Sequence, residues 1–140
     1  MNWKIGLLFF LYVSCSGQQG SYYKLECNSY FTIKIPANSK DTLFSYEEGF
    51  FKTYFWENGD ILDIHCGSMN DNIYISDSLR YEVLSLKEDN QKKIIKGKEK
   101  KGEKTFGVLK IKGYRVTISF LSSPNRENIF LEILNQVKKE

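Results

Sequence analysis

The chain has 140 residues, a formal net charge of +3 and 15% aromatic residues, which are mostly Tyr and Phe. A chain of this length builds one domain around a single core. The aromatic content and the presence of only two prolines favour strands and exclude a disordered chain. A nucleic-acid-binding face concentrates far more positive charge than this chain carries, so we expect no nucleic-acid partner.

The first residues have the pattern of an export signal. Lys4 supplies one positive charge, an apolar run follows from Ile5 to Val13, and small residues surround Cys15. The apolar run is much shorter than the ~20 residues that a membrane-spanning helix needs, so we expect no transmembrane anchor. We predict that residues 1–14 form a signal peptide.

Leu11 and Ser14 precede Cys15 in an arrangement that resembles the signal of bacterial lipoproteins, in which the cysteine receives a diacylglycerol. Tyr12 departs from the usual pattern, and the alternative is ordinary signal cleavage after Gly17. The composition is also similar to that of small envelope lipoproteins of the Bacteroidetes. The resemblance implies lipidation (palmitate and related acyl chains) at Cys15 and a membrane-anchored protein that faces the periplasm.

After the lipid site we expect a flexible tether over residues 15–24 and a single domain over residues 25–140. Removal or acylation of Cys15 leaves two cysteines, Cys27 and Cys66, and export would place them in an oxidising compartment where disulfides form. A disulfide between them would close a loop of about 40 residues and stabilise the fold by about 3–4 kcal/mol. The alternative is a pair of buried, reduced thiols.

The first half of the domain contains three predicted strands. Tyr30–Ile35 alternates apolar and polar residues and precedes a proline, which predicts a strand, and residues 37–41 are predicted as a loop. Phe50–Trp56 and Ile61–Cys66 flank an Asn-Gly pair at positions 58 and 59. This pattern predicts a β-hairpin with a type I′ turn.

On the second hairpin strand, Leu62, Ile64 and Cys66 share one face, which we predict to be buried. His65 is the only histidine in the chain. It points away from Cys66, because adjacent strand residues face opposite sides, so the two cannot form a nucleophilic dyad. Asp63 and His65 share a face, but no third ligand is spaced to complete a metal site. We predict no enzyme, no metal and no cofactor.

The second half adds further strands and ends in a helix. Ile73–Ile75 is predicted as a short strand, Arg80–Leu86 as a strand or a helix, and Thr105–Lys112 and Tyr114–Leu121 as strands. Ser123 is a candidate helix N-cap before a proline. The apolar residues that then fall on one helical face are Phe130, Ile133, Leu134 and Val137.

Two segments are candidates for partner binding. Lys92–Lys104 holds seven lysines and two glutamates, and it is either a solvated loop or a contact for anionic lipid, glycan or an acidic partner. The aromatic block over residues 44–56 is either buried on both faces or presents an exposed platform. The residues that we predict as an interaction surface are Tyr54, Trp56, Lys96, Lys98, Lys100 and Lys101.

These patterns predict an α+β domain in which an antiparallel β-sheet carries a C-terminal α-helix packed on one face. We expect a non-enzymatic interaction or accessory module of the cell envelope, anchored in a membrane by its N-terminal lipid and binding a protein partner. The sequence does not distinguish the inner from the outer membrane. Two alternatives stay open, a component of an envelope secretion or conjugation machine and an immunity-type inhibitor of a toxin.

Overall fold

A computed structural model of the chain describes residues 20–67 and 72–140. In these residues there are ten strands, two short helical turns and one longer helix. The helical segments are α2 (Ile73–Ser76), the 3-10 turn η1 (Pro124–Arg126) and α3 (Glu127–Gln136). The strands are β1 (Ser21–Glu26), β2 (Tyr30–Ile35), β3 (Lys40–Tyr46), β4 (Gly49–Phe55), β5 (Ile61–Cys66), β6 (Tyr81–Glu88), β7 (Lys92–Glu99), β8 (Thr105–Ile111), β9 (Val116–Ser122) and β10 (Lys138–Lys139).

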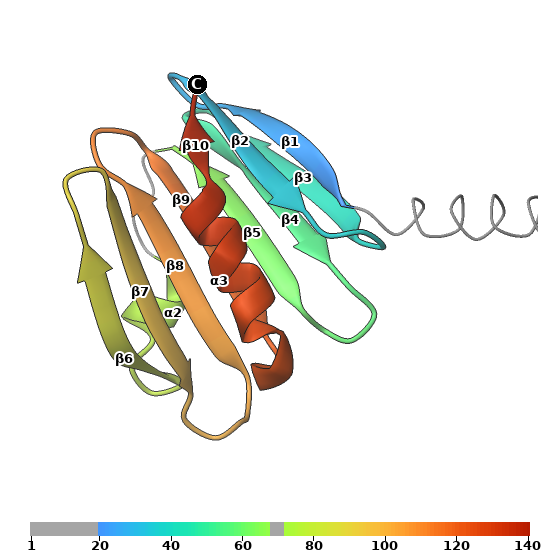
Figure 1. Cartoon of the computed structure of the whole chain (residues 1–140), viewed down its shortest axis with the longest axis vertical. Helices are drawn as coiled ribbons and strands as arrows, with labels where there is room; N and C mark the ends of the chain where they lie inside the picture. Colours follow the sequence, from blue (N-terminus) through green and yellow to red (C-terminus); the bar gives the residue numbers. More distant parts are fainter. Residues whose placement is uncertain (1–19, 68–71) are drawn as a thin grey trace, which may run out of the picture.

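The strands form two antiparallel sheets. One has seven strands in the order β3-β4-β5-β9-β8-β7-β6, and the other has three in the order β1-β2-β10. The smaller sheet and α3 lie together over one face of the larger sheet (Figure 1). The predicted α+β fold with a single sheet is therefore wrong, because the molecule is mostly β and resembles a β-sandwich in which α3 fills part of the second layer.

The sequence predicts neither the second sheet nor two strands of the first, because β1, β3 and β7 lack a clear apolar alternation. β1 begins at Ser21, inside the segment predicted as a tether, so the folded domain starts before residue 25. β3 covers most of a stretch without a predicted strand, and almost all of its residues are exposed. β7 occupies the basic segment that was considered as a solvated loop. A strand that faces solvent does not need the period-two pattern that reveals a buried strand.

The predicted hairpin is confirmed, but its type I′ turn is wrong. The Trp56 N–H donates to the Asp60 carbonyl at 3.1 Å, and the Gly59 N–H donates to the Trp56 carbonyl at 3.0 Å. Gly59 has a positive φ of 89°, whereas Asn58 does not. This is the three-residue hairpin loop in which a type I turn is followed by one left-handed residue.

The extra loop residue changes which side chains of β4 are buried. Tyr54 pairs with Leu62 and Phe55 pairs with Ile61, whereas a two-residue loop would pair Phe55 with Leu62. A one-residue change of register moves every side chain of a strand to the opposite face. Tyr54 and Trp56 consequently lie in the core at 8% exposure each. The prediction that they form an exposed interaction surface is wrong.

The main core lies between the two layers. Leu62 and Ile64, predicted as core residues, are fully buried there. The predicted apolar face of α3 is also confirmed, and its Phe130 ring stacks on Phe120 of β9 with centroids 5.3 Å apart. The other buried residues of that helical face and its end are Ile133, Leu134 and Val137.

A second, smaller core covers the opposite face of the large sheet at its β7–β8 half. The predicted strand at Ile73–Ile75 is wrong, because these residues begin the short helix α2, whose N-cap Asn72 accepts a hydrogen bond from the Tyr74 N–H at 3.0 Å. Tyr74 packs against Tyr81 and Phe106. The segment from 80 to 86, for which the sequence allows a strand or a helix, belongs to strand β6 from Tyr81 onward.

Candidate interaction surface

The large sheet has an outer face, which points away from the small sheet and α3. The half of this face that β3, β4 and β5 form is not covered by α2. Three directly paired residues, Phe44, Phe51 and His65, cross it from one strand to the next. Tyr46 joins them from the end of β3. We call these four residues the aromatic cluster. Phe44 is 64% exposed, and Phe51 and Tyr46 are partly buried, so the cluster reaches the molecular surface.

The aromatic cluster is held together by ring stacking and one polar contact. The Phe51 and His65 rings stack with centroids 4.1 Å apart and an interplanar angle of 3°. A hydrogen bond of 2.7 Å joins the Tyr46 hydroxyl to Nε2 of His65. Phe44 lies at the outer end, 6.4 Å from the Phe51 ring. The single histidine of the chain therefore acts as a packing residue of an aromatic surface.

Burial lowers the pKa of His65 below its ordinary value of 6.5. The unfolded chain then binds more protons than the folded protein as the pH falls from about 6.5 to the folded pKa. We expect the His65 contribution to the free energy of unfolding to be complete above pH ~6.5 and to be lost progressively below it. The His65 Cε1 proton should titrate below 6.5 in an NMR experiment, and denaturant unfolding at several pH values should show the loss.

His65→Gln is the control. Both proteins have the same carboxylates, so the effect of carboxylate titration cancels when the pH dependence of the free energy of unfolding is compared between them. The variant should have a flatter profile between neutral and mildly acidic pH. Titration of His65 above 6.5, or identical profiles for the two proteins, would contradict the prediction.

Asp63 shares the outer face with His65, as predicted, but each of them has its own partner. The Thr53 hydroxyl donates to Oδ1 of Asp63 at 2.6 Å. Burial raises the pKa of Asp63, and the bond from Thr53 acts against that shift. Among the described residues no three His, Cys, Asp or Glu side chains gather in a group that would hold a metal ion. The Thr53–Asp63 pair therefore serves as a polar cross-strand contact beside the aromatic cluster.

β3 is an edge strand of the large sheet, and the backbone along its free edge is not paired with another strand of the described chain. Its seven residue pairs with β4 continue without irregularity. Leu43 and Phe44 lie on opposite faces of this edge and are 63% and 64% exposed. The opposite edge, β6, has a bulge between Val83 and Ser85, a device that protects sheet edges from further pairing. β3 is therefore the edge that is open to strand addition.

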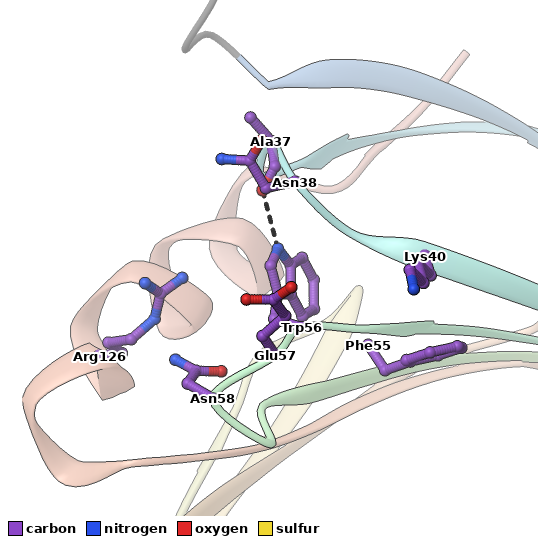
Figure 2. A pocket seen from close by; sticks show the side chains of 8 residues that line it. All are labelled: Ala37, Asn38, Lys40, Phe55, Trp56, Glu57, Asn58 and Arg126. Carbon is purple, nitrogen blue, oxygen red and sulfur yellow. Dashed lines mark hydrogen bonds between the residues drawn. The ribbon is translucent and has the colours of Figure 1, made fainter.

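An open cavity of about 660 Å³ lies where β3 begins, beside the hairpin loop (Figure 2). Trp56 forms its inner wall, and the indole Nε1–H donates to the Ala37 carbonyl at 2.9 Å. Lys40 and Arg126 bring positive charge to the lining and Glu57 brings negative charge. The cavity therefore carries charges of both signs beside the aromatic rings of Phe55 and Trp56, and it is continuous with the β3 edge through Lys40.

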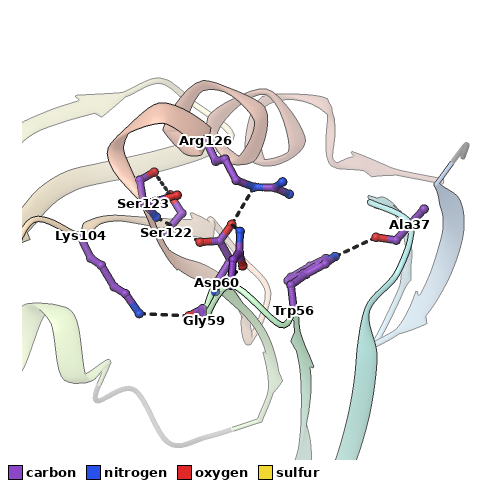
Figure 3. A network of polar contacts seen from close by, with 9 residues as sticks. Ala37, Trp56, Gly59, Asp60, Lys104, Ser122, Ser123 and Arg126 are labelled. Carbon is purple, nitrogen blue, oxygen red and sulfur yellow. Dashed lines mark hydrogen bonds and ion pairs between the residues drawn. The ribbon is translucent and has the colours of Figure 1, made fainter.

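A buried carboxylate fixes the loop that borders this cavity. Asp60 is fully buried, accepts a hydrogen bond from the Ser123 N–H at 3.1 Å, and forms an ion pair with Nε of Arg126 at 2.7 Å (Figure 3). The Lys104 amine donates to the Gly59 carbonyl at 3.2 Å. Ser123 contributes here through its backbone, and its side chain makes no capping bond. The network joins the hairpin loop to the chain that enters α3 and to the β7–β8 connection.

Cys27 and Cys66 are joined by a disulfide, with their Cα atoms 5.8 Å apart. Cys27 follows β1 and Cys66 ends β5, so the bond connects the small sheet to the large one. The alternative of two reduced thiols does not apply to this structure. The bond also places the Cys66 sulfur on the core side, whereas His65 faces outward.

The lysines predicted as an interaction surface lie far from β4 in the sheet order. Lys96 and Lys98 belong to β7, and Lys96 forms an ion pair with Glu127 at the start of α3, with 3.7 Å between the charged atoms. Lys100 and Lys101 are exposed in the connection that follows β7. They do not form one surface with Tyr54 and Trp56, because β5, β9 and β8 lie between β4 and β7.

The predicted signal peptide and the predicted lipidation site, Cys15, lie outside the described residues. In the described part of the chain we find no helix that is long and apolar enough to cross a membrane. Comparisons of the chain with protein-family models, with curated proteins and with solved structures gave no match.

Proposed function

We propose that the chain is a lipoprotein of the cell envelope, anchored through Cys15 on the periplasmic side, whose domain binds a partner protein without acting as an enzyme. The export pattern at the N-terminus supports the location. The disulfide between Cys27 and Cys66 suits the same oxidising compartment.

The observation that carries the binding role is the open edge of β3 with its two exposed apolar residues, Leu43 and Phe44. An extended segment of a partner adds to such an edge through backbone hydrogen bonds, and its alternate side chains meet the surface on each side. Phe44 with the aromatic cluster offers an apolar surface on one face, and Leu43 offers one on the other. We therefore propose a partner segment with apolar residues at alternating positions.

The cavity at the start of β3 supports the same mode of binding. A strand that pairs along β3 passes Lys40, which lines the cavity together with Glu57 and Arg126. A polar or charged side chain of the partner would enter there, next to charges of both signs. The backbone hydrogen bonds supply affinity, and the apolar contacts together with the cavity fix the register of the added strand.

The test is site-specific photo-crosslinking in the cells that produce the protein, followed by separation of soluble and membrane fractions. A photoreactive phenylalanine analogue at position 44 should give an adduct of defined mass in the membrane fraction. The additional change Leu43→Lys should greatly reduce this adduct, because it places a charge in the proposed interface. Cys15→Ser should move the protein to the soluble fraction.

The matched control carries the same analogue at Leu86, an exposed residue of the bulged edge β6, where we expect no adduct of defined mass. Equal adducts from positions 44 and 86, or an adduct that Leu43→Lys does not change, would overturn the assignment of β3. Retention of the Cys15→Ser protein in the membrane fraction would overturn the lipid anchor, and mass spectrometry of the mature N-terminus would identify the cleavage site.

A further inference from the structure

A second cavity, of about 620 Å³, lies at the end of the sheet opposite the hairpin loop. The β6–β7 turn, the β8–β9 turn and β10 surround it. Four lysines contribute to its lining, and they come from three separate parts of the chain. These residues are Lys92, Lys112, Lys138 and Lys139.

The amines of Lys92 and Lys139 are held against other groups of the fold. The Lys92 amine donates to the Val137 carbonyl at 2.5 Å and to the Asn135 carbonyl at 3.2 Å, at the end of α3. Lys138 and Lys139 belong to β10, which pairs with β2. The amine of Lys139 lies 4.7 Å from the centroid of the Tyr114 ring. The charges of Lys92 and Lys139 are therefore positioned before any ligand arrives, and Lys138 is exposed next to Lys139 on β10.

Carboxylates neutralise only part of this charge. Glu88 forms an ion pair with Lys112 at 2.7 Å, and Asp89 accepts the backbone N–H groups of Gln91 and Lys92 at 2.7 Å each. Within residues 20–67 and 72–140, no carboxylate lies at ion-pair distance from Lys92 or from the two lysines of β10. The lining of the cavity thus retains a net positive charge.

The environment of Lys92 agrees with this arrangement. Burial lowers the pKa of its ammonium group, Asp89 acts against the shift, and the positive charge of Lys138 adds to it. Like charges held close together by a folded backbone repel one another, and a bound anion relieves that repulsion. The ammonium group of lysine is a compact charge that binds phosphate well.

The wall of the cavity is apolar beside the charges. Tyr114 is partly buried, and its ring meets Phe31 edge to face with centroids 5.3 Å apart. Ile111 adds aliphatic surface. A ligand that fits this cavity combines an anionic group with a flat or aliphatic portion.

We propose that this cavity binds a phosphate-bearing ligand, whose phosphate lies among Lys92, Lys138 and Lys139 and whose apolar portion lies against Tyr114. The phosphate belongs either to a soluble phosphate ester or to a phospholipid headgroup, and both present the same chemistry to the lysines. The site shares no residue with the β3 edge, so this proposal is independent of the proposed partner binding and is tested separately.

The test uses the full chain carrying Cys15→Ser, with inorganic pyrophosphate as the first probe in an NMR titration of the backbone amides. We expect saturable shifts at Lys92, Lys138 and Lys139. The double variant Lys138→Glu/Lys139→Glu should bind at least about tenfold more weakly. The milder double variant Lys138→Gln/Lys139→Gln should also weaken binding, and it serves if the first variant does not fold.

Lys100→Glu/Lys101→Glu is the matched control, because it makes the same change of charge on an exposed connection away from the cavity. It should leave the affinity for pyrophosphate within about twofold at equal ionic strength. Equal losses in the two double variants would show a non-specific charge effect and overturn the proposal, as would the absence of saturable shifts together with the absence of vesicle binding.

The second arm measures co-sedimentation with phosphatidylcholine vesicles that contain or lack phosphatidylglycerol. Binding that needs phosphatidylglycerol and is lost in Lys138→Gln/Lys139→Gln identifies a lipid headgroup as the source of the phosphate. Pyrophosphate binding without vesicle binding identifies a soluble phosphate ester. Vesicle binding that the lysine variants leave unchanged, without pyrophosphate binding, would overturn the site.

Discussion

Removal of the disulfide, by Cys27→Ala together with Cys66→Ala, is expected to lower the free energy of unfolding by about 4 kcal/mol. The two cysteines are 39 positions apart in the sequence. Their bond removes the loop-closure entropy of this segment from the unfolded chain, and the gain grows with the logarithm of loop length. A loss of this size is a large part of the total stability of a small domain.

The position of the disulfide adds to its effect on the native structure. Cys27 lies directly after β1, where the chain turns into β2, and Cys66 ends β5 in the centre of the other layer. The bond thus ties the three-stranded sheet to the seven-stranded sheet at one end of the core. Without it, we expect the small sheet to open locally at a lower free energy than the rest of the domain.

Denaturant unfolding with and without a thiol reductant measures the effect. The wild-type protein should lose about 4 kcal/mol on reduction, and the double alanine variant should show the same low stability in both conditions. Hydrogen exchange should show the largest loss of protection in β1 and β2. A difference below about 1 kcal/mol between oxidised and reduced wild-type protein would contradict the prediction.

The length of one hairpin loop explains why the sequence predicts the two hairpin strands correctly and the exposed face of the first strand wrongly. An Asn-Gly pair is compatible with the two-residue loop and also with the three-residue loop that the structure has. Asp60, whose carbonyl closes the observed loop, is bound to Ser123 and Arg126 far along the chain. A local pattern does not contain that contact, so the register of β4, and with it the exposed face, was not predictable.

Strands that face the core on one side were predicted well. Tyr30–Ile35 and Ile61–Cys66 have the predicted bounds, because burial on one side imposes their alternation. β3 and β7 carry exposed or lysine-rich positions and reveal no such period. The buried face of α3 was predictable for the same reason as the buried strands.

The two candidate sites differ in how far the sequence alone could predict them. The aromatic block was identified, and only its exposed face was assigned wrongly, because a register decides that face. The lysines of the second cavity were not identified as a group. Lys92 belongs to the basic segment, whereas Lys112 and Lys138 come from other parts of the chain. The pairing of β7 with β8 brings Lys112 near Lys92, and the pairing of β10 with β2 places Lys138 at the same cavity.

Arg126→Ala is expected to lower the free energy of unfolding by about 3 kcal/mol, because it leaves the buried charge of Asp60 without its partner. Asp60 is 0% exposed, and its remaining contacts are neutral donors, the Ser123 N–H and the amide of Asn58 at 3.0 Å. The Arg126 side chain is partly exposed, so water reaches the vacated position and keeps the loss near the lower end of the range for buried pairs.

Lys96→Ala is the matched control, since Lys96 also supplies the cation of an ion pair near the start of α3, but with 3.7 Å between the charged atoms and with greater exposure. That variant should lose less than about 1 kcal/mol. Denaturant unfolding of both variants, and of Asp60→Asn/Arg126→Ala, completes the comparison. The double variant should be more stable than Arg126→Ala alone, because Asn carries no charge that needs a partner.

Equal, small losses in Arg126→Ala and Lys96→Ala would contradict a structural role for the buried pair. The pair also bears on binding, since Asp60 closes the loop that sets the register of β4 and thereby the exposed face of Phe44 and Phe51. Arg126→Ala should therefore weaken crosslinking from position 44 even under conditions where the domain remains folded. A folded Arg126→Ala protein that crosslinks as wild type would show that the β3 surface keeps its geometry without this pair.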